Sequence, residues 1–578
     1  MSTIVSGDGE MLRLQYSRLC CLIHNSLHPF TAKSTESITK EEEKSLLITL
    51  SQVSNQIKLW TDELASGDHG TPLNEVSSNS KSTIVSSICH SSASECVFKI
   101  INELVFLLAI QSPYVRHLSG NVLVAISKFV VSMSSENHWE EFIKSLCLHF
   151  KFIIHKAISP DHDSPASSII LVLRNILKHL KHEEDDEILE VYLNTLSSCL
   201  QDTPWESCNT VSNEFCGHLL QLFCSIVSNS DDKNPVIHLI FNIFPRFLTW
   251  YQSNQAENNG YTRISQYIQH KILVLMMRLS SIIKLECEMI LSWLNLINKH
   301  FQDLLFESLT QSNTKEDDCL KESPFLLDET CHHQHLQRRV FFLYLKCSFH
   351  LIRLQETKGN QCVCGDVKCC SKKGFIAIHE WLKKHLVKCN QFAESFLQLY
   401  IHEDDMLFEI LLLLTDIPFC HKQQKDWTLD VLEKDIIVLL LDVFEPVHLF
   451  HIFLLEIHYD HQVLLDYLIS KDTGATCAEY LLRCLRIICD KWDPFLKFPI
   501  CKEVGSLSSQ KRRKVMNDSF ETDHKNQKSF KEPFHNAREC LLLLKKSIES
   551  LHHKNLFPYN PKVLLKRLSR FQELCPRP

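Results

Sequence analysis

Glycine is scarce in this chain, where it occupies 12 of the 578 positions, against about 7% in ordinary globular proteins. Bent strands and tight turns depend on glycine, whereas packed helices do not. Hydrophobic residues make up 44% of the sequence, which is enough for an extensive core. Together these two observations predict an all-α fold.

The sequence also shows no excess of positive charge, no pattern of a secretory leader in its first residues and no long apolar run. Its formal net charge is −8, so no overall basic field attracts a nucleic-acid backbone, and we expect no direct nucleic-acid binding. The N-terminus, MSTIVSGDGEMLRLQ, has no apolar core of a signal peptide. No uninterrupted apolar run reaches the ~18 residues that span a membrane. We therefore expect a soluble protein with no membrane partner, whose 25 cysteines stay reduced.

No motif of a familiar catalytic site occurs in the sequence. Gly-rich phosphate-binding loops and the Gly-x-Ser-x-Gly nucleophile elbow are both missing. His379-Glu380 is not followed by a second histidine one helical turn later, as a zinc peptidase would need. The acidic run His182–Glu187 is explained by the preference of carboxylates for helix N-termini. We therefore expect no enzyme activity, no cofactor and no small-molecule substrate.

What the chain does contain is apolar residues at helical spacing along nearly its whole length. One such helix is expected to begin at Ser112, which can cap it, and at Pro113, whose missing N–H costs nothing at the first helical position. Similar openings precede helices at Pro165, Pro235 and Pro561. The helix after Pro113 has one apolar face, with intervals of three and four: Val115, Leu118, Val122, Ile126 and Phe129.

The segment SPYVRHLSGNVLVAI (Ser112–Ile126) is similar to a helix of armadillo or HEAT repeats. Those repeats recur every ~40–47 residues, whereas Pro113, Pro165 and Pro235 are 52 and 70 residues apart. We therefore predict a degenerate armadillo/HEAT-like α-solenoid, in which helix pairs stack on their neighbours. The alternative is an irregular helical globule, which obeys the same packing rules.

Changes in composition divide the chain into five parts. An N-terminal helical segment (1–65) and a Ser-rich linker (66–93) precede the solenoid body (94–495). Residues 501–534 lack apolar periodicity and are rich in charge, which predicts a disordered basic linker. Residues 535–578 are expected to form a small C-terminal αα-hairpin domain.

The block from Glu445 to Trp492 combines strong apolar faces with helix-start signals. Asp460 can cap one helix, and Thr476 with Glu479 fits the Thr-x-x-Glu capping box. Such a block is packing surface without reactive groups, which is typical of a binding or scaffolding protein. The last helix is expected to bury one apolar face: Leu481, Leu485, Ile488 and Trp492.

Part of this block also resembles a known family. YDHQVLLDYLIS (Tyr459–Ser470) and EYLLRCLR (Glu479–Arg486) resemble a block of the Lines family, developmental regulators linked to Wnt-type signalling. LLLLKKSIESLHHKNLFPYNPKVLLKRLSRFQEL (Leu541–Leu574) resembles that family's short C-terminal domain. The resemblance implies that the solenoid body is the family's N-terminal-type domain, with a start further upstream, and that 535–578 is its C-terminal-type domain. It also implies the behaviour ascribed to the family, which is restraint of zinc-finger transcription factors.

The basic linker offers a candidate nuclear-import signal, because import receptors have acidic grooves that read exposed cations. Ser508 and Ser509 lie just upstream, and phosphate on them would offset the positive charge. The competing interpretation is a solvated charge run that no receptor reads. The signal consists of four consecutive cations: Lys511, Arg512, Arg513 and Lys514.

Four cysteines lie close together in the body: Cys362, Cys364, Cys369 and Cys370. Four thiols can hold a tetrahedral zinc ion. However, their spacing differs from paired Cys-x2-Cys knuckles, and the adjacent Cys369 and Cys370 cannot both ligate one ion without strain. We therefore expect a loop with reduced thiols and no metal, with zinc binding as the alternative.

Taken with the resemblance, these observations predict a non-enzymatic, protein-binding regulator in cytoplasm and nucleus. It would modulate Wnt-type signalling and transcriptional patterning in development, with other proteins as partners, among them transcription factors or signalling components. The alternative is a cytoplasmic helical scaffold or adaptor in trafficking or protein turnover, in which the four cations have no function.

Overall fold

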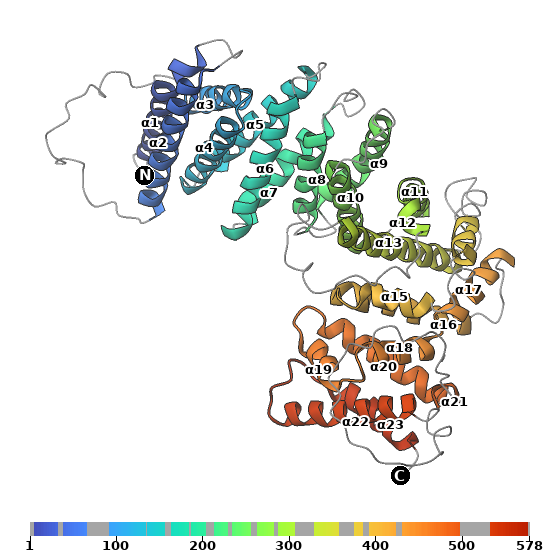
Figure 1. Cartoon of the computed structure of the whole chain (residues 1–578). Helices are drawn as coiled ribbons and strands as arrows, with labels where there is room; N and C mark the ends of the chain where they lie inside the picture. Colours follow the sequence, from blue (N-terminus) through green and yellow to red (C-terminus); the bar gives the residue numbers. More distant parts are fainter. Residues whose placement is uncertain are drawn as a thin grey trace, which may run out of the picture. The chain divides into compact units, whose positions relative to one another are not determined.

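The structure is a computed structural model, and every regular element that it describes is an α-helix (Figure 1). The all-α prediction is therefore confirmed for these residues. The chain divides into two compact units, Met1–Lys284 (unit 1) and Leu285–Pro578 (unit 2). The described residues are 5–32, 38–65, 92–133, 136–156, 163–183, 186–203, 213–228, 234–255, 263–282, 287–306, 329–357, 375–384, 392–423, 431–496 and 532–575.

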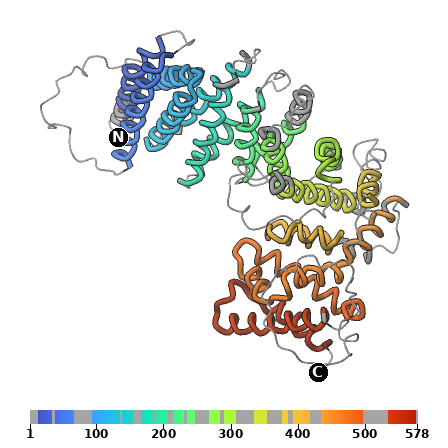
Figure 2. Tube along the Cα trace, in the orientation of Figure 1, coloured from blue at the N-terminus to red at the C-terminus, as the bar shows by residue number. Residues whose placement is uncertain are grey.

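Unit 1 is a two-layer stack of helices, which Figure 2 lets the reader follow in chain order from blue to green. Helices α1, α3, α5, α7 and α9 contact one another in succession, and so do α2, α4, α6, α8 and α10. Each helix therefore packs on the helix two positions further along the chain, which is the arrangement of an armadillo/HEAT-like solenoid. The bounds are α1 Val5–Thr31, α2 Lys40–Ala65, α3 Ala93–Leu108, α4 Pro113–Ser132, α5 Glu136–Lys156, α6 Asp163–Glu183, α7 Asp186–Gln201, α8 Asn213–Val227, α9 Pro235–Gln255 and α10 Arg263–Ile282.

The repeat length can be read from contacts between equivalent helices. Arg174 of α6 donates a hydrogen bond to Ser225 of α8, 51 residues later, and Gln221 of α8 donates to Tyr267 of α10, 46 residues later. These separations lie close to the ~40–47 residues of armadillo and HEAT repeats. The irregular proline spacing has a simple cause, because Pro235 opens α9, which belongs to the other layer.

The predicted start of α4 is confirmed. The Ser112 hydroxyl accepts a hydrogen bond from the Val115 amide at 3.3 Å, and Pro113 is the first helical residue. The predicted apolar face is buried at Val115, Val122, Ile126 and Phe129, while Leu118 is half-buried. The cap fixes where α4 begins, and the apolar stripe is the side on which it packs against its neighbours in the stack.

Unit 2 continues the same principle with longer connections. The contact series α11–α13–α16–α20–α23 forms one row, and α15–α18–α22 forms another. The predicted C-terminal hairpin is present as α22 and α23, and it packs on α19 and α20. The bounds are α11 Cys287–His300, α12 Gln302–Phe306, α13 Glu329–Thr357, a helix at 375–384, α15 Phe392–Tyr400, α16 Asp404–Gln423, α17 Val431–Val443, α18 Pro446–Glu456, α19 His461–Ile469, α20 Gly474–Asp490, α21 Trp492–Leu496, α22 Glu532–His553 and α23 Lys562–Leu574.

The predicted capping box of α20 is wrong, although Asp460 caps α19 as expected through a 2.8 Å hydrogen bond to its acidic oxygen from the Gln462 amide. α20 begins at Gly474 with Thr473 as its N-cap, three residues earlier than a box with Thr476 as N-cap requires. Its first turn therefore already contains Thr476, whose hydroxyl donates to the Thr473 carbonyl at 2.9 Å. The Thr473 carbonyl accepts the first hydrogen bond of the helix, from the Cys477 amide. Thr476 and Glu479 therefore lie inside the helix and do not cap it.

The apolar face predicted for α20 is correct except at Trp492. Leu481, Leu485 and Ile488 are buried, but α20 ends at Asp490, and Trp492 opens the short helix α21. The Trp492 side chain is half-buried and lies against Phe571 of α23, with ring centroids 5.6 Å apart. The chain turns at Lys491, so the periodicity cannot continue straight across it.

One segment among the described residues, Lys434–Glu456, is long and apolar enough to cross a membrane by length and composition. Counting uninterrupted apolar runs misses it. The segment is 67% buried inside the fold, and it divides into α17 and α18 at Phe444-Glu445. Most of its surface contacts other helices, so its apolar composition is explained by burial in the core of the fold.

We expect replacement of Leu485 with alanine to lower the free energy of unfolding of unit 2 by about 2–5 kcal/mol. Its side chain is fully buried, so the substitution removes contacts and leaves a cavity. Urea denaturation followed by tryptophan fluorescence measures the change. Leu455→Ala on α18 is the matched control, because Leu455 is 43% exposed. A loss below about 1 kcal/mol for Leu485→Ala would contradict the assigned packing.

Candidate protein-binding surface

The sequence-predicted site residues fall outside the described part of the chain. The four cations Lys511 to Lys514 lie between Leu496 and Glu532, and the four cysteines Cys362 to Cys370 lie between α13 and residue 375. The import signal and the metal-free loop therefore stay predictions. The last three residues of the linker expected at 501–534 are helical, because α22 begins at Glu532. Among the described residues, no group of three or more His, Cys, Asp or Glu could hold a metal ion.

The C-terminal hairpin is joined to the preceding helices by Tyr559, which lies between α22 and α23. Its hydroxyl is 3.0 Å from the Leu468 carbonyl oxygen and 3.3 Å from that of Gly474. Leu468 ends the buried face of α19, and Gly474 starts α20. Burial raises the pKa of Tyr559 well above its usual value, so the hydroxyl remains a donor. We call this contact the Tyr559 latch.

Gly474 is required at the latch for a steric reason. A Cβ atom at this position would lie 2.7 Å from the Leu468 carbonyl oxygen, the same atom that Tyr559 binds. Real Cβ contacts are never so short, and the obstacle is backbone that cannot rotate away. Glycine therefore lets α19 and α20 approach closely enough to present both carbonyls to one hydroxyl.

An aromatic cluster forms the second junction between the hairpin and the helices before it. The Phe495 ring of α21 lies 5.8 Å from the ring of Phe534 in α22 and 5.8 Å from that of Phe571 in α23. Trp492 contacts the same two rings. His451 of α18 stacks on Phe495 at 4.4 Å, and its Nε2 bonds the Phe495 carbonyl at 3.1 Å. Burial lowers the pKa of His451 to about 4, so the ring is neutral at physiological pH.

Charged side chains connect α13 to α16 along their length. His335 and Arg338 both contact Glu403, at 3.2 and 3.3 Å. Two turns further along, Lys346 lies 4.0 Å from Glu409. The hydrogen bond with His335 is the largest cause that lowers the pKa of Glu403, while burial lowers that of Lys346. Residue numbers rise together along α13 and α16 from one contact to the next, so the two helices run parallel.

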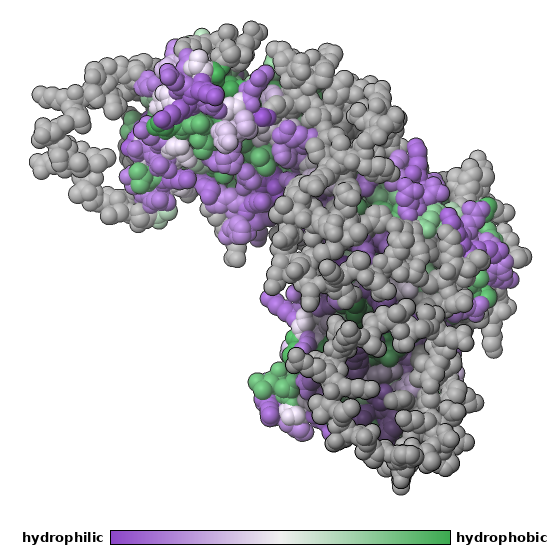
Figure 3. Space-filling view, in the orientation of Figure 1, coloured by the Kyte–Doolittle hydropathy of each residue, from purple (hydrophilic) through white to green (hydrophobic). Residues whose placement is uncertain are grey.

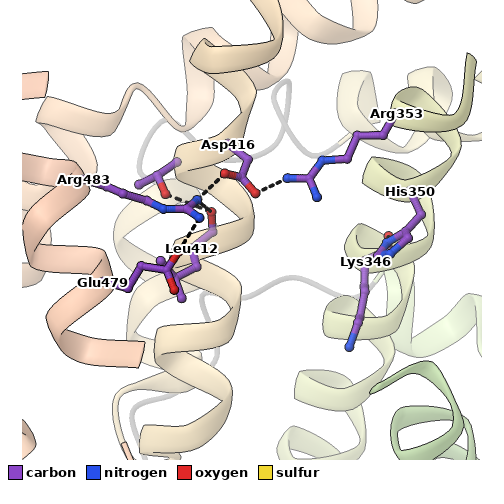
Figure 4. A network of polar contacts seen from close by, with 8 residues as sticks. Lys346, His350, Arg353, Leu412, Asp416, Glu479 and Arg483 are labelled. Atoms are coloured by element: carbon purple, nitrogen blue, oxygen red, sulfur yellow. Dashed lines mark hydrogen bonds and ion pairs between the residues drawn. The ribbon is translucent and has the colours of Figure 1, made fainter. Parts of the chain in front are cut away.

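The same series ends in a chain of four alternating charges across three helices (Figure 4). Arg353 of α13 binds one oxygen of Asp416 in α16, and Arg483 of α20 binds the other. Arg483 also contacts Glu479 at 2.5 Å and the Leu412 carbonyl at 3.5 Å. The contacts are 63 and 67 residues apart in sequence. Since each charge already has a partner, this network sets the register of the helices and does not offer free groups to a ligand.

Three large apolar side chains remain exposed around the Tyr559 latch. Ile469 follows the latch acceptor Leu468 and is 40% exposed, while Leu556 and Val563 lie within four residues of Tyr559 and are 65% and 63% exposed. Figure 3 shows hydrophobic residues gathered on the surface beside α19. We call these three residues the latch rim. Exposed apolar side chains that gather on one part of the surface are candidates for a protein-binding site.

The arrangement offers hydrophobic contact and shape, and it holds no group positioned for bond making. Sequence reasoning did not find the latch or its rim, because their residues come from segments about ninety positions apart. The available signal was Pro558-Tyr559-Asn560-Pro561, in which two prolines restrict the backbone around one tyrosine.

Replacing Tyr559 with phenylalanine is expected to destabilise the packing of the hairpin by about 1 kcal/mol, because two carbonyls lose a donor. Gly474→Ala should have a larger effect because the new methyl group meets backbone. Hydrogen exchange of α19–α23 amides measures both changes locally. The matched control is Tyr114→Phe on α4, where the side chain is 69% exposed. Unchanged protection in both latch variants would mean that the hairpin is held elsewhere.

Family models described as "Lines N-terminus" and "Lines C-terminus" match residues 331–501 and 537–573. No curated protein matches. A solved structure, described as a circular tandem repeat protein with novel repeat topology and enhanced subunit contact surfaces, is 9% identical over 95% of this chain and 99% of that one. The TM-score between the two structures is 0.19. The two family matches occur in the family's order and meet at the Tyr559 latch, and the chain belongs to the Lines family.

Proposed function

We propose that this protein is a non-enzymatic, protein-binding regulator that modulates Wnt-type signalling and transcriptional patterning. Membership of the Lines family supports a developmental regulator role in the broad sense. An all-helical repeat suits this role, because stacked helices present extended surfaces for other proteins. The partners would be transcription factors or signalling components, and the protein would act in both cytoplasm and nucleus.

The observation that carries the proposal is the latch rim. Ile469 belongs to the segment matched by the N-terminal family model, whereas Leu556 and Val563 belong to the segment matched by the C-terminal one. The rim is therefore complete only when the two segments pack together through Tyr559. A partner that binds the rim would recognise the assembled body and not either segment alone, which gives the two-part family pattern a physical reason.

The rim also has the chemistry of a protein contact. Leu556 and Val563 each leave more than 60% of the side chain exposed, and Lys554 and Lys562, both exposed, flank them in sequence. An apolar centre with a charged border is the usual arrangement of a protein–protein interface. Such a surface contributes binding energy by removing apolar area from water, about 25 cal/mol per Å².

A double variant, Leu556→Asp with Val563→Asp, is expected to lose partner proteins without losing the fold, because both side chains are exposed. Affinity purification with quantitative mass spectrometry from the same cells compares it with the native chain. The matched control is Ile48→Asp with Leu59→Asp on α2, at 50% and 56% exposure. The proposal predicts partners that the control retains and the rim variant loses. If both variants retain the same partners, the rim is not the binding surface.

The nuclear part of the proposal depends on the four cations from Lys511 to Lys514. A chain of 67.2 kDa is too large to cross the nuclear pore efficiently by diffusion. Replacing all four with alanine removes the charge that an acidic receptor groove would read, so a tagged protein should shift toward the cytoplasm. Fluorescence microscopy measures the distribution, and circular dichroism should show unchanged helix content. An unchanged distribution would favour the cytoplasmic scaffold in trafficking or protein turnover.

A further inference from the structure

A group of cations in unit 1 lies where three successive helices of one layer meet. Arg174 and Lys181 are two turns apart on α6, so they share a face. Arg278 reaches the same place from α10. All three side chains belong to half-buried residues. We call these three residues the cationic seam.

The seam is held by neutral acceptors at the C-terminal end of α8. Arg174 Nε donates to the Ser225 hydroxyl at 3.3 Å. Lys181 Nζ donates to the Ser225 carbonyl, and Arg278 donates to the Cys224 carbonyl. These bonds fix three positive groups within reach of two adjacent residues of one helix. The positions are therefore set by the repeat and do not depend on flexible surface side chains.

The positive charge of the seam is not neutralised inside the described part of unit 1. None of Arg174, Lys181 and Arg278 forms an ion pair with a carboxylate there, in contrast to Lys151, which lies 2.7 Å from Asp202. Burial and then the nearby Arg278 lower the pKa of Lys181 to about 8. Like charges are thus close enough to repel each other, and the partial negative charge of the α8 C-terminus partly offsets that repulsion.

The polar surroundings extend the seam across the layer. On α8, Gln221 lies about one turn and His218 about two turns before the acceptors Cys224 and Ser225. The Tyr267 hydroxyl of α10 contacts Gln221, and the Ser167 carbonyl of α6 contacts His218. Lys271 adds a further cation on α10, above the Tyr267 ring at 5.3 Å. The row therefore combines cations with hydrogen-bonding groups over three helices of one layer, and Glu214, whose charge partly offsets the lowering of the His218 pKa by burial, is an acidic side chain beside it.

We infer that the cationic seam of α6, α8 and α10 binds an acidic segment of a partner protein. Charge complementarity selects an anion, because these three fixed cations have no carboxylate as an ion-pair partner among the residues that the structure describes. The row of polar groups across successive helices suits an extended chain with several acidic side chains. Nucleic acid is disfavoured by the net charge of −8 over the whole protein. The site lies outside both family matches and does not depend on the latch rim.

Fluorescence anisotropy with the full chain tests this inference. The probe is a labelled twelve-residue peptide rich in Asp and Glu, and the comparison peptide carries Asn and Gln at the same positions. The seam variant is Arg174→Gln, Lys181→Gln and Arg278→Gln, because glutamine keeps an N–H donor for the α8 carbonyls while it removes the charge. The matched control, Lys40→Gln, Lys44→Gln and Lys58→Gln, makes the same charge change at exposed positions of α2.

We expect the seam variant to weaken binding of the acidic peptide by at least about tenfold, which corresponds to ~1.4 kcal/mol, while the control changes it less than about threefold. Equal binding by native chain and seam variant would overturn the inference. So would equal binding of the amide peptide. Competition by a DNA oligonucleotide of the same charge at the same concentration would show a general polyanion site and would also overturn it.

A second measurement needs no variant of the seam. Lys181 should react quickly with an amine-acetylating reagent near pH 8, because its lowered pKa leaves a large neutral fraction. Saturating acidic peptide should slow this labelling, as read by mass spectrometry, because the anion restores the charged form and covers the amine. Lys58 serves as the internal reference. An unchanged ratio of Lys181 to Lys58 labelling would refute binding at the seam even if the triple variant does not fold.

Discussion

Each inner helix of a two-layer stack has to be apolar on more than one side. Helix α6, for example, contacts α4 and α8 in its own layer and α5 and α7 in the other. A narrow apolar stripe would leave one of these contacts polar and unsatisfied. This requirement explains why the chain combines 44% hydrophobic residues with so little glycine. It also explains why α18 buries eight of its eleven residues and mimics a membrane segment.

Polar contacts between equivalent helices then set the register of the stack. Buried aromatic side chains direct their polar atoms to a neighbour's backbone, as the Trp139 indole N–H of α5 does to the Ile188 carbonyl of α7 at 3.3 Å. In unit 2, ion pairs such as Arg353–Asp416–Arg483 have the same role. Two apolar helix faces can shift along each other and keep much of their dispersion energy. A hydrogen bond or ion pair forms only when its two groups are at the right distance, so it fixes how far one helix is shifted along the other. The helices of unit 1 therefore follow one another at regular intervals. In unit 2, α13 and α16 stay parallel although longer segments of chain connect the helices.

The C-terminal hairpin ends the stack in unit 2. A terminal repeat has to cover the apolar face of the helix before it, and α23 does so against α20. Tyr559, Gly474 and the aromatic cluster around Phe495 give this closure a defined geometry. The closure also brings Leu556 and Val563 to the surface beside Ile469. The packing of the hairpin and the proposed binding at the latch rim thus both depend on the Tyr559 latch, which joins the two segments that the family models match.

The amino-acid sequence by itself determined the helices and their starts, as at Ser112, Pro113 and Asp460, because caps and apolar spacing act within a few residues. It also determined the family, through the segments around Tyr459 and Leu541. Only the tertiary structure decided which layer Pro235 serves, why Thr476 does not cap α20, and where Trp492 packs. The latch, its rim and the cationic seam likewise required the fold. Their residues are 44 to 91 positions apart, and no local pattern reports a contact that chain folding creates over such distances.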